Sequence, residues 1–80
     1  MYFVYILYSR QADRYYVGQS DNPQERLIAH NSGISRYTSI ASDWTIVHLE
    51  EFQTRTEAIQ RERAIKKRKS RKYIESLFHN

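Results

Sequence analysis

Five residues along this chain are of types that serve phosphodiester chemistry: two tyrosines, an arginine, a histidine and a glutamate. They are Tyr5, Tyr16, Arg26, His30 and Glu62. An arginine guanidinium matches two phosphate oxygens, and a histidine can accept or donate a proton near neutral pH. A carboxylate that leaves several waters in place suits Mg²⁺. The set therefore predicts metal-assisted cleavage of a phosphodiester, provided that the fold brings the five side chains together.

The two tyrosines lie in apolar stretches, Val4-Tyr5-Ile6 and Tyr16-Val17-Gly18. A tyrosine whose pKa is near 10 acts as a general base only with help from a neighbouring cation, a metal-bound water or a histidine. The alternative is that both are core aromatics whose hydroxyl groups find hydrogen-bond partners. Gly18 has no side chain and would let a phosphate approach the backbone, although it could equally end a strand.

Arg26 and His30 are four residues apart in a predicted helix, so their side chains face the same way. Simple alternatives are a solvated side chain for Arg26 and a favourable interaction of His30 with the helix dipole. Glu62 falls within the apolar face of a second predicted helix, where a carboxylate is costly unless it is paired or binds a metal ion. The alternative for Glu62 is a surface ion pair with Lys66, four residues on.

Composition favours a small nucleic-acid-binding domain. The chain has 80 residues, no cysteine and a net charge of +4, so we expect one domain over residues 1–80 in a reducing cytoplasm. No apolar run approaches the roughly 20 residues of a membrane helix, and no membrane association is expected. Residues 61–80 hold eight basic and two acidic side chains. A stretch this basic attracts polyanions, or else forms a solvated helix face.

Several residues are candidates for contact with nucleic acid. The loop residues Arg36 and Tyr37, together with Thr38 and Trp44, could reach it, but ordinary loop packing is an equal alternative. The predicted contacts are Gly18, Arg36, Tyr37, Lys66, Lys67, Arg68 and Lys69.

The elements that must position these residues are three strands and two or three helices. We expect strands over residues 2–8, 14–19 and 45–52, and helices that begin after Asn22, Thr54 and Ser70. Ser70 could instead mark a weak point in one long helix. The first strand is apolar on both faces, so it should be central and covered on both sides. The order β-β-α-β-α-α predicts an α+β fold with a small, mainly antiparallel sheet.

In this order the motifs resemble the GIY-YIG nuclease superfamily. The likeness is greatest to its small stand-alone members, which are similar to the N-terminal catalytic domain of the nuclease that acts in nucleotide excision repair. Val4-Tyr5-Ile6 corresponds to the first motif and Tyr16-Val17-Gly18 to the second. The resemblance covers about residues 2–78 and includes Arg26, His30 and Glu62.

The resemblance implies a three-stranded antiparallel sheet flanked by helices, and metal-dependent hydrolysis of DNA phosphodiester bonds in repair or processing. Tyr5 would be the general base or would orient the attacking water, with help from Tyr16. Arg26 would stabilise charge on the phosphate, and His30 would relay a proton. Glu62 would hold one Mg²⁺ or Mn²⁺ ion.

Other classes of function stay open from the sequence. One is a non-catalytic nucleic-acid-binding module that uses the basic C-terminal helix. Another is a structural partner in a larger repair complex. We expect DNA as the substrate, a monomer or weak dimer as the oligomeric state, and a protein partner that could supply substrate specificity. A requirement for a divalent metal would separate catalysis from binding alone.

Overall fold

The protein, described by a computed structural model over residues 1–78, combines β-strands with short helices. The elements are β1 (Tyr2–Ser9), β2 (Arg14–Ser20), α1 (Pro23–Asn31), the 3₁₀ helix η1 (Thr38–Ile40), β3 (Thr45–Phe52), α2 (Arg55–Arg68) and α3 (Arg71–Ser76). The predicted α+β class and the order β-β-α-β-α-α are confirmed, and η1 is an addition within the predicted loop. The last two residues of the predicted domain lie outside the described residues.

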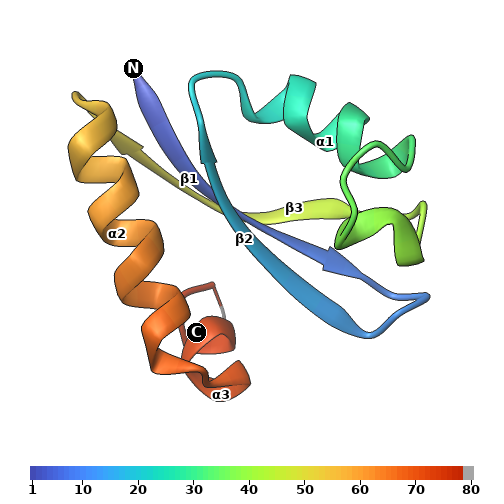
Figure 1. The fold of residues 1–80 in the computed structure, drawn as a ribbon. Helices are drawn as coiled ribbons and strands as arrows, with labels where there is room; N and C mark the ends of the chain where they lie inside the picture. Colours follow the sequence, from blue (N-terminus) through green and yellow to red (C-terminus); the bar gives the residue numbers. More distant parts are fainter. Residues whose placement is uncertain (79–80) are drawn as a thin grey trace.

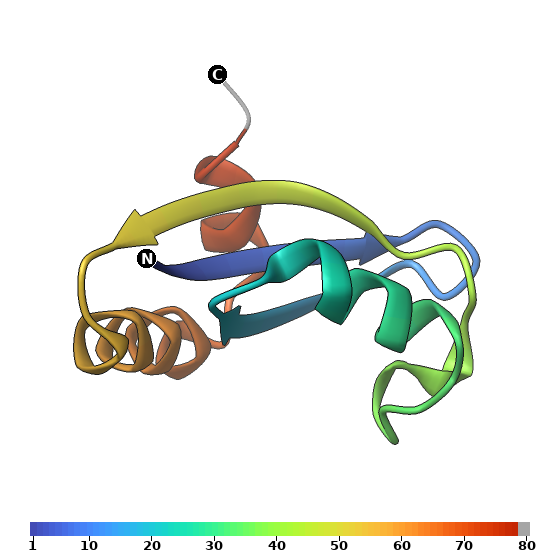
Figure 2. The ribbon, with the colours of Figure 1, turned by 90° about the horizontal axis from the view of Figure 1, so that it is seen from above.

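The sheet is antiparallel and has β1 in its centre, in the order β2-β1-β3, as Figures 1 and 2 show. Successive side chains of β1 point to opposite faces. Val4 and Ile6 pack on the face covered by α2 and α3, whereas Tyr5 and Leu7 pack on the other face with Trp44. All four β1 side chains are at most 1% exposed. The prediction of a central strand that is covered on both sides is confirmed.

The first two helices begin at the capping residues that the sequence indicates. The Asn22 side chain accepts a hydrogen bond from the Glu25 backbone nitrogen at 3.2 Å, with Pro23 in the first helical position. Thr54 and Glu57 form both halves of a capping box at the start of α2. These caps satisfy backbone donors that have no partner within the helix. They fix where the helices that carry the candidate site residues start.

Helix α2 ends before α3 begins, so the C-terminal segment forms two helices and not one long helix. Lys69 adopts a left-handed conformation with φ 48°, and the Ser70 hydroxyl caps α3 by accepting from the Tyr73 nitrogen at 3.1 Å. A left-handed residue ends a helix because it turns the chain away from the helix axis. None of the helices in residues 1–78 has the length and apolar character needed to cross a membrane.

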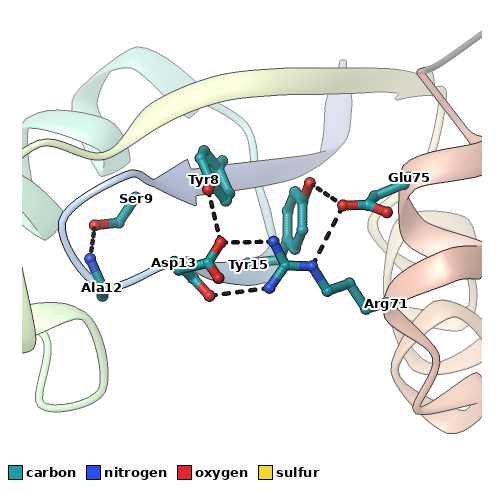
Figure 3. A network of polar contacts seen from close by, with 7 residues as sticks. All are labelled: Tyr8, Ser9, Ala12, Asp13, Tyr15, Arg71 and Glu75. Carbon is teal, nitrogen blue, oxygen red and sulfur yellow. Dashed lines mark hydrogen bonds and ion pairs between the residues drawn. The ribbon is translucent and has the colours of Figure 1, made fainter.

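A polar network fastens α3 to the turn between β1 and β2 (Figure 3). Arg71 donates to the Asp13 carboxylate at 2.6 Å and to the Asp13 carbonyl oxygen at 3.1 Å. Glu75 accepts from the Tyr15 hydroxyl at 2.9 Å and from Arg71 at 3.3 Å, and Tyr8 donates to Asp13 at 2.7 Å. The network ties the C-terminal helix to the hairpin that carries the two tyrosine motifs.

Candidate active site

The pairing of β1 with β2 sets the positions of the two motif tyrosines. Tyr5 lies opposite Gly18, and Leu7 lies opposite Tyr16. Tyr5 and Tyr16 are therefore diagonal neighbours on one face of the sheet, with ring centroids 6.4 Å apart. A β-carbon on Gly18 would lie 2.5 Å from Cζ of Tyr5. The missing side chain of Gly18 thus makes room for the Tyr5 ring, and direct contact of Gly18 with phosphate stays a prediction.

His30 at the end of α1 joins the tyrosines from the side. Its side chain is fully buried, and its Nε2 atom lies 3.1 Å from the Tyr5 hydroxyl oxygen. Its ring centroid is 4.8 Å from that of Tyr16. The other nitrogen, Nδ1, lies 2.7 Å from the Thr38 hydroxyl oxygen. In the tautomer that carries its proton on Nδ1, His30 donates a hydrogen bond to the Thr38 hydroxyl. Its Nε2 atom then accepts a hydrogen bond from the Tyr5 hydroxyl.

Burial and the charge of Arg26 set the protonation of this pair. Burial raises the pKa of Tyr5, while a hydrogen bond and the positive charge from Arg26 act in the opposite direction. Burial also lowers the pKa of His30, and the charge of Arg26 lowers that pKa further. Both groups are therefore neutral near pH 7, as a hydroxyl donor and an imidazole acceptor. Arg26 itself is exposed, where its guanidinium can meet a phosphate.

Glu62 on α2 both forms the ion pair with Lys66 and lies near the site, the two alternatives that the sequence offered for it. Its side chain is 19% exposed, and it forms an ion pair with Lys66 at 2.8 Å. Its negative charge also contributes to raising the pKa of Tyr5, so the carboxylate acts on the tyrosine electrostatically. The Lys66 ammonium lies 5.6 Å from the centroid of the Tyr16 ring. Helix α2 therefore brings both a carboxylate and a cation to the tyrosines.

The structure thus gathers the five predicted residues at the β2 edge of the sheet. Helix α1 supplies Arg26 and His30 from one face, and α2 supplies Glu62 from the other. Figure 1 shows these helices on opposite sides of the sheet, with β2 between them. A phosphate at this edge would meet a guanidinium, a tyrosine and histidine pair, and a carboxylate.

The acidic side chains bear on how a metal ion could bind. Within residues 1–78, no three His, Asp or Glu side chains lie close enough to hold a metal ion together. Mg²⁺ usually keeps several waters and binds through one or two carboxylates together with substrate phosphates. The single carboxylate of Glu62 fits an ion that is completed by substrate oxygens and water. Such an ion would compete with Lys66 for this carboxylate.

The predicted nucleic-acid contacts divide into two groups. A groove of about 800 Å³ runs beside the site, and Tyr37, Lys66 and Lys69 line it. The other four residues lie outside its lining: Gly18, Arg36, Lys67 and Arg68. The Arg68 guanidinium lies 4.1 Å from the centroid of the Tyr73 ring, on the α3 side of the helix.

Two loop residues belong to the core. Thr38 is fully buried and Trp44 is 1% exposed, with the Trp44 indole nitrogen donating to the Thr38 carbonyl oxygen at 2.8 Å. Ordinary packing, the alternative given for them from the sequence, is confirmed. Thr38 also holds His30, a contact that the sequence did not predict. The two are eight residues apart across an irregular loop, so no periodic pattern could indicate the contact.

Sheet topology, helix placement and site together define a nuclease-like α+β domain. Residues 1–74 match the family model for the GIY-YIG catalytic domain. The chain belongs to this family of nuclease domains, which act on nucleic acid and generally use a divalent metal ion.

Small proteins from several bacteria and an archaeon are similar to this chain over most of its length. The UPF0213 protein of Enterococcus faecalis is 35% identical over 98% of this chain and 93% of its own length. UPF0213 protein VNG_2274C of Halobacterium salinarum is 35% identical over 98% of this chain and its own full 100%. UPF0213 protein lwe0147 of Listeria welshimeri is 37% identical over 82% of this chain and 73% of its own length. Their names state no activity, and no solved structure matches the chain significantly.

Proposed function

We propose that residues 1–80 form a single metal-dependent endonuclease domain that hydrolyses phosphodiester bonds of DNA, in the repair or processing of DNA in the cytoplasm. The observation that supports this most is the 3.1 Å contact between the Tyr5 hydroxyl and Nε2 of the buried His30. A buried hydroxyl paired with a neutral imidazole is poised for proton transfer. Exposed strand edges allow a monomer or a weak dimer, and a protein partner could supply substrate choice.

The roles follow from the position of each side chain. Tyr5 activates or orients the attacking water, and His30 accepts the proton that Tyr5 gives up. Because burial raises the pKa of Tyr5, the tyrosine needs this acceptor to act as a base near pH 7. Tyr16 lies beside His30, with the two rings tilted by 55°, and assists Tyr5. Arg26 stabilises the charge that develops on the phosphate.

Glu62 is the residue that would hold one Mg²⁺ or Mn²⁺. The ion, when bound, supplies Lewis-acid stabilisation of the phosphate and of the leaving oxygen. Glu62 also holds Lys66 in place, which keeps a cation beside Tyr16. Loss of the carboxylate should therefore weaken metal binding and misplace this cation.

Nicking of supercoiled plasmid with Mg²⁺ or Mn²⁺ tests the proposal. Wild type is compared with Tyr5→Phe and Glu62→Gln, which change little volume. Tyr8→Phe and Glu51→Gln are the matched controls, because they remove a hydroxyl and a charge outside the cluster. We expect both cluster variants to lose roughly 10²-fold or more in rate, the scale of one general acid–base group, while the controls keep the wild-type rate.

Two outcomes would contradict this function. Equal nicking by wild type and both cluster variants would reject these residues as the site. Metal-independent DNA binding without nicking of plasmid or branched DNA would favour the non-catalytic binding module. Circular dichroism of each variant checks that it is folded.

A further inference from the structure

The groove beside the proposed active site shares Tyr16 and Lys66 with it, but the rest of its lining has no part in the proposed chemistry. It is bounded by β2, by the C-terminal half of α2 and by the start of α3, and its volume is about 800 Å³. The lining holds four basic side chains, Arg14, Lys66, Lys69 and Arg71, against one acidic side chain, Asp13. The groove is therefore complementary to a polyanion.

Aromatic rings and cations lie close to one another in this groove. The ring centroid of Tyr37 lies 5.7 Å from that of Tyr16, and Tyr37 is 50% exposed. Lys66 lies over the Tyr16 ring, and Arg71 lies over the Tyr15 ring at 5.1 Å. Grooves that bind single-stranded nucleic acid combine these two features, because bases stack on the rings while phosphates pair with the cations.

The exposed ring of Tyr37 in the groove lining favours an unpaired strand over a duplex. In a duplex the faces of the bases are stacked on one another, so a ring in a groove cannot reach them. An unpaired base can turn into the groove and cover the exposed ring of Tyr37. We infer that the groove holds an unpaired nucleic-acid strand that leads to the phosphate at the active site, with one base stacked on Tyr37 and a phosphate near Lys69.

The network in Figure 3 indicates which cations of the groove are available to the phosphates of this strand. Arg71 is already engaged by Asp13 and Glu75, so its charge is largely neutralised at the end of the groove near the β1–β2 turn. Lys69, in contrast, forms no ion pair with any residue of the described part of the chain. The phosphates should therefore approach Lys69 and avoid the carboxylate of Asp13.

The inference rests on the proposed function only in taking the phosphate at the end of the groove to be the one that is cleaved. Binding of a strand in the groove is tested independently of cleavage. A fluorescent DNA strand of about 16 nucleotides, near the upper site size of one small single-strand-binding fold, is compared with its duplex in EDTA. We expect tighter binding of the single strand. Tyr37→Ala should weaken that binding by roughly fivefold or more, the scale of one lost stacking contact, and Tyr37→Phe should retain it.

Lysine variants locate the strand on the surface. The slope of log K against log salt is negative, and Lys69→Gln should make it shallower by about 0.7, the value for one phosphate contact on a single strand. Lys72→Gln is the matched control, since it removes the same charge from an exposed lysine of α3 that lies outside the groove lining. It should leave the slope near that of wild type.

Either of two results would overturn the inference: equal affinity for single strand and duplex, or equal effects of Lys69→Gln and Lys72→Gln. Since the binding is measured in EDTA, it stands apart from the nicking assay. If the protein does not nick but binds single strands through Tyr37 and Lys69, the nuclease function is contradicted and the inference about the groove stands. If the protein nicks but does not prefer a single strand to a duplex, the inference about the groove is contradicted and the nuclease function stands.

Discussion

Gly18 on β2 lies opposite Tyr5 on β1, and a β-carbon at position 18 would overlap the Tyr5 ring, 2.5 Å from its Cζ atom. Space, rather than an unusual backbone conformation, is what requires glycine there. The position of the Tyr5 ring in turn sets the distance of its hydroxyl from His30. A residue without a side chain therefore places the pair on which the proposed chemistry depends.

Gly18→Ala should both destabilise the fold and reduce nicking. Forcing a methyl group into this contact costs about 1–3 kcal/mol, the usual range for overpacking, and moves Tyr5 away from His30. Chemical denaturation and the nicking assay measure the two effects. Gly33→Ala is the control, because Gly33 has φ 80° and open space around it. It should lose stability through backbone strain alone and keep its nicking rate, and full nicking by Gly18→Ala would contradict the placement of Tyr5.

His30 should make stability depend on pH. The ordinary pKa of histidine is 6.5, and burial and Arg26 lower the pKa of His30 in the folded protein. Below pH 6.5 the unfolded chain therefore binds more protons, so the free energy of unfolding falls as pH decreases from about 7 towards 5. His30→Gln should remove this slope, measured by denaturation at several pH values. His48→Gln should keep it, and a slope unchanged in His30→Gln would show that another group is responsible.

Thr38 should act on the chemistry only through His30. Thr38→Val keeps the shape but leaves Nδ1 of His30 without its partner, which costs about 1–3 kcal/mol for a buried polar group. We expect a lower kcat, a shifted pH profile and a mixed tautomer in NMR spectra of the imidazole nitrogens. Thr38→Ser restores the hydroxyl and should rescue all three. If Thr38→Val changed stability alone, the hydroxyl would have no positioning role.

Asp13→Asn should strengthen binding of single-stranded DNA. Asp13 is the one acidic residue in the groove lining and has φ 51°, a conformation that asparagine also tolerates. The substitution removes a repulsive charge and one of the two carboxylates that pair with Arg71, so the salt dependence of binding should become steeper. The cost in stability should be small, because the ion pair is exposed. Asp21→Asn removes an exposed charge outside the groove, and an equal gain from it would point to net charge alone.

Local patterns in the sequence predicted most of the fold. The two apolar faces of residues 2–8 placed β1 in the centre of the sheet, and Asn22 and Thr54 predicted where α1 and α2 begin. These signals can be read because alternation and capping act between residues a few positions apart. The short helix η1 carried no such signal, since its contacts come from the loop packing onto α1.

The basic run at residues 66–69 illustrates a limit of the same reasoning. Neighbouring residues of a helix point about 100° apart, so four consecutive cations cannot all face one ligand. Packing of α2 against β2 brings Lys66 and Lys69 to the groove and leaves Lys67 and Arg68 outside it. The sequence alone predicted all four as contacts.

The sequence by itself determined the strands, the caps and the residue types available for chemistry, because these depend on interactions between near neighbours. Tertiary structure decided that Tyr5 meets His30, 25 residues away, and that Arg71 meets Asp13, 58 residues away. It also decided that Gly18 makes room for the Tyr5 ring. These contacts depend on strand register and on how the helices pack against the sheet, which no local pattern specifies.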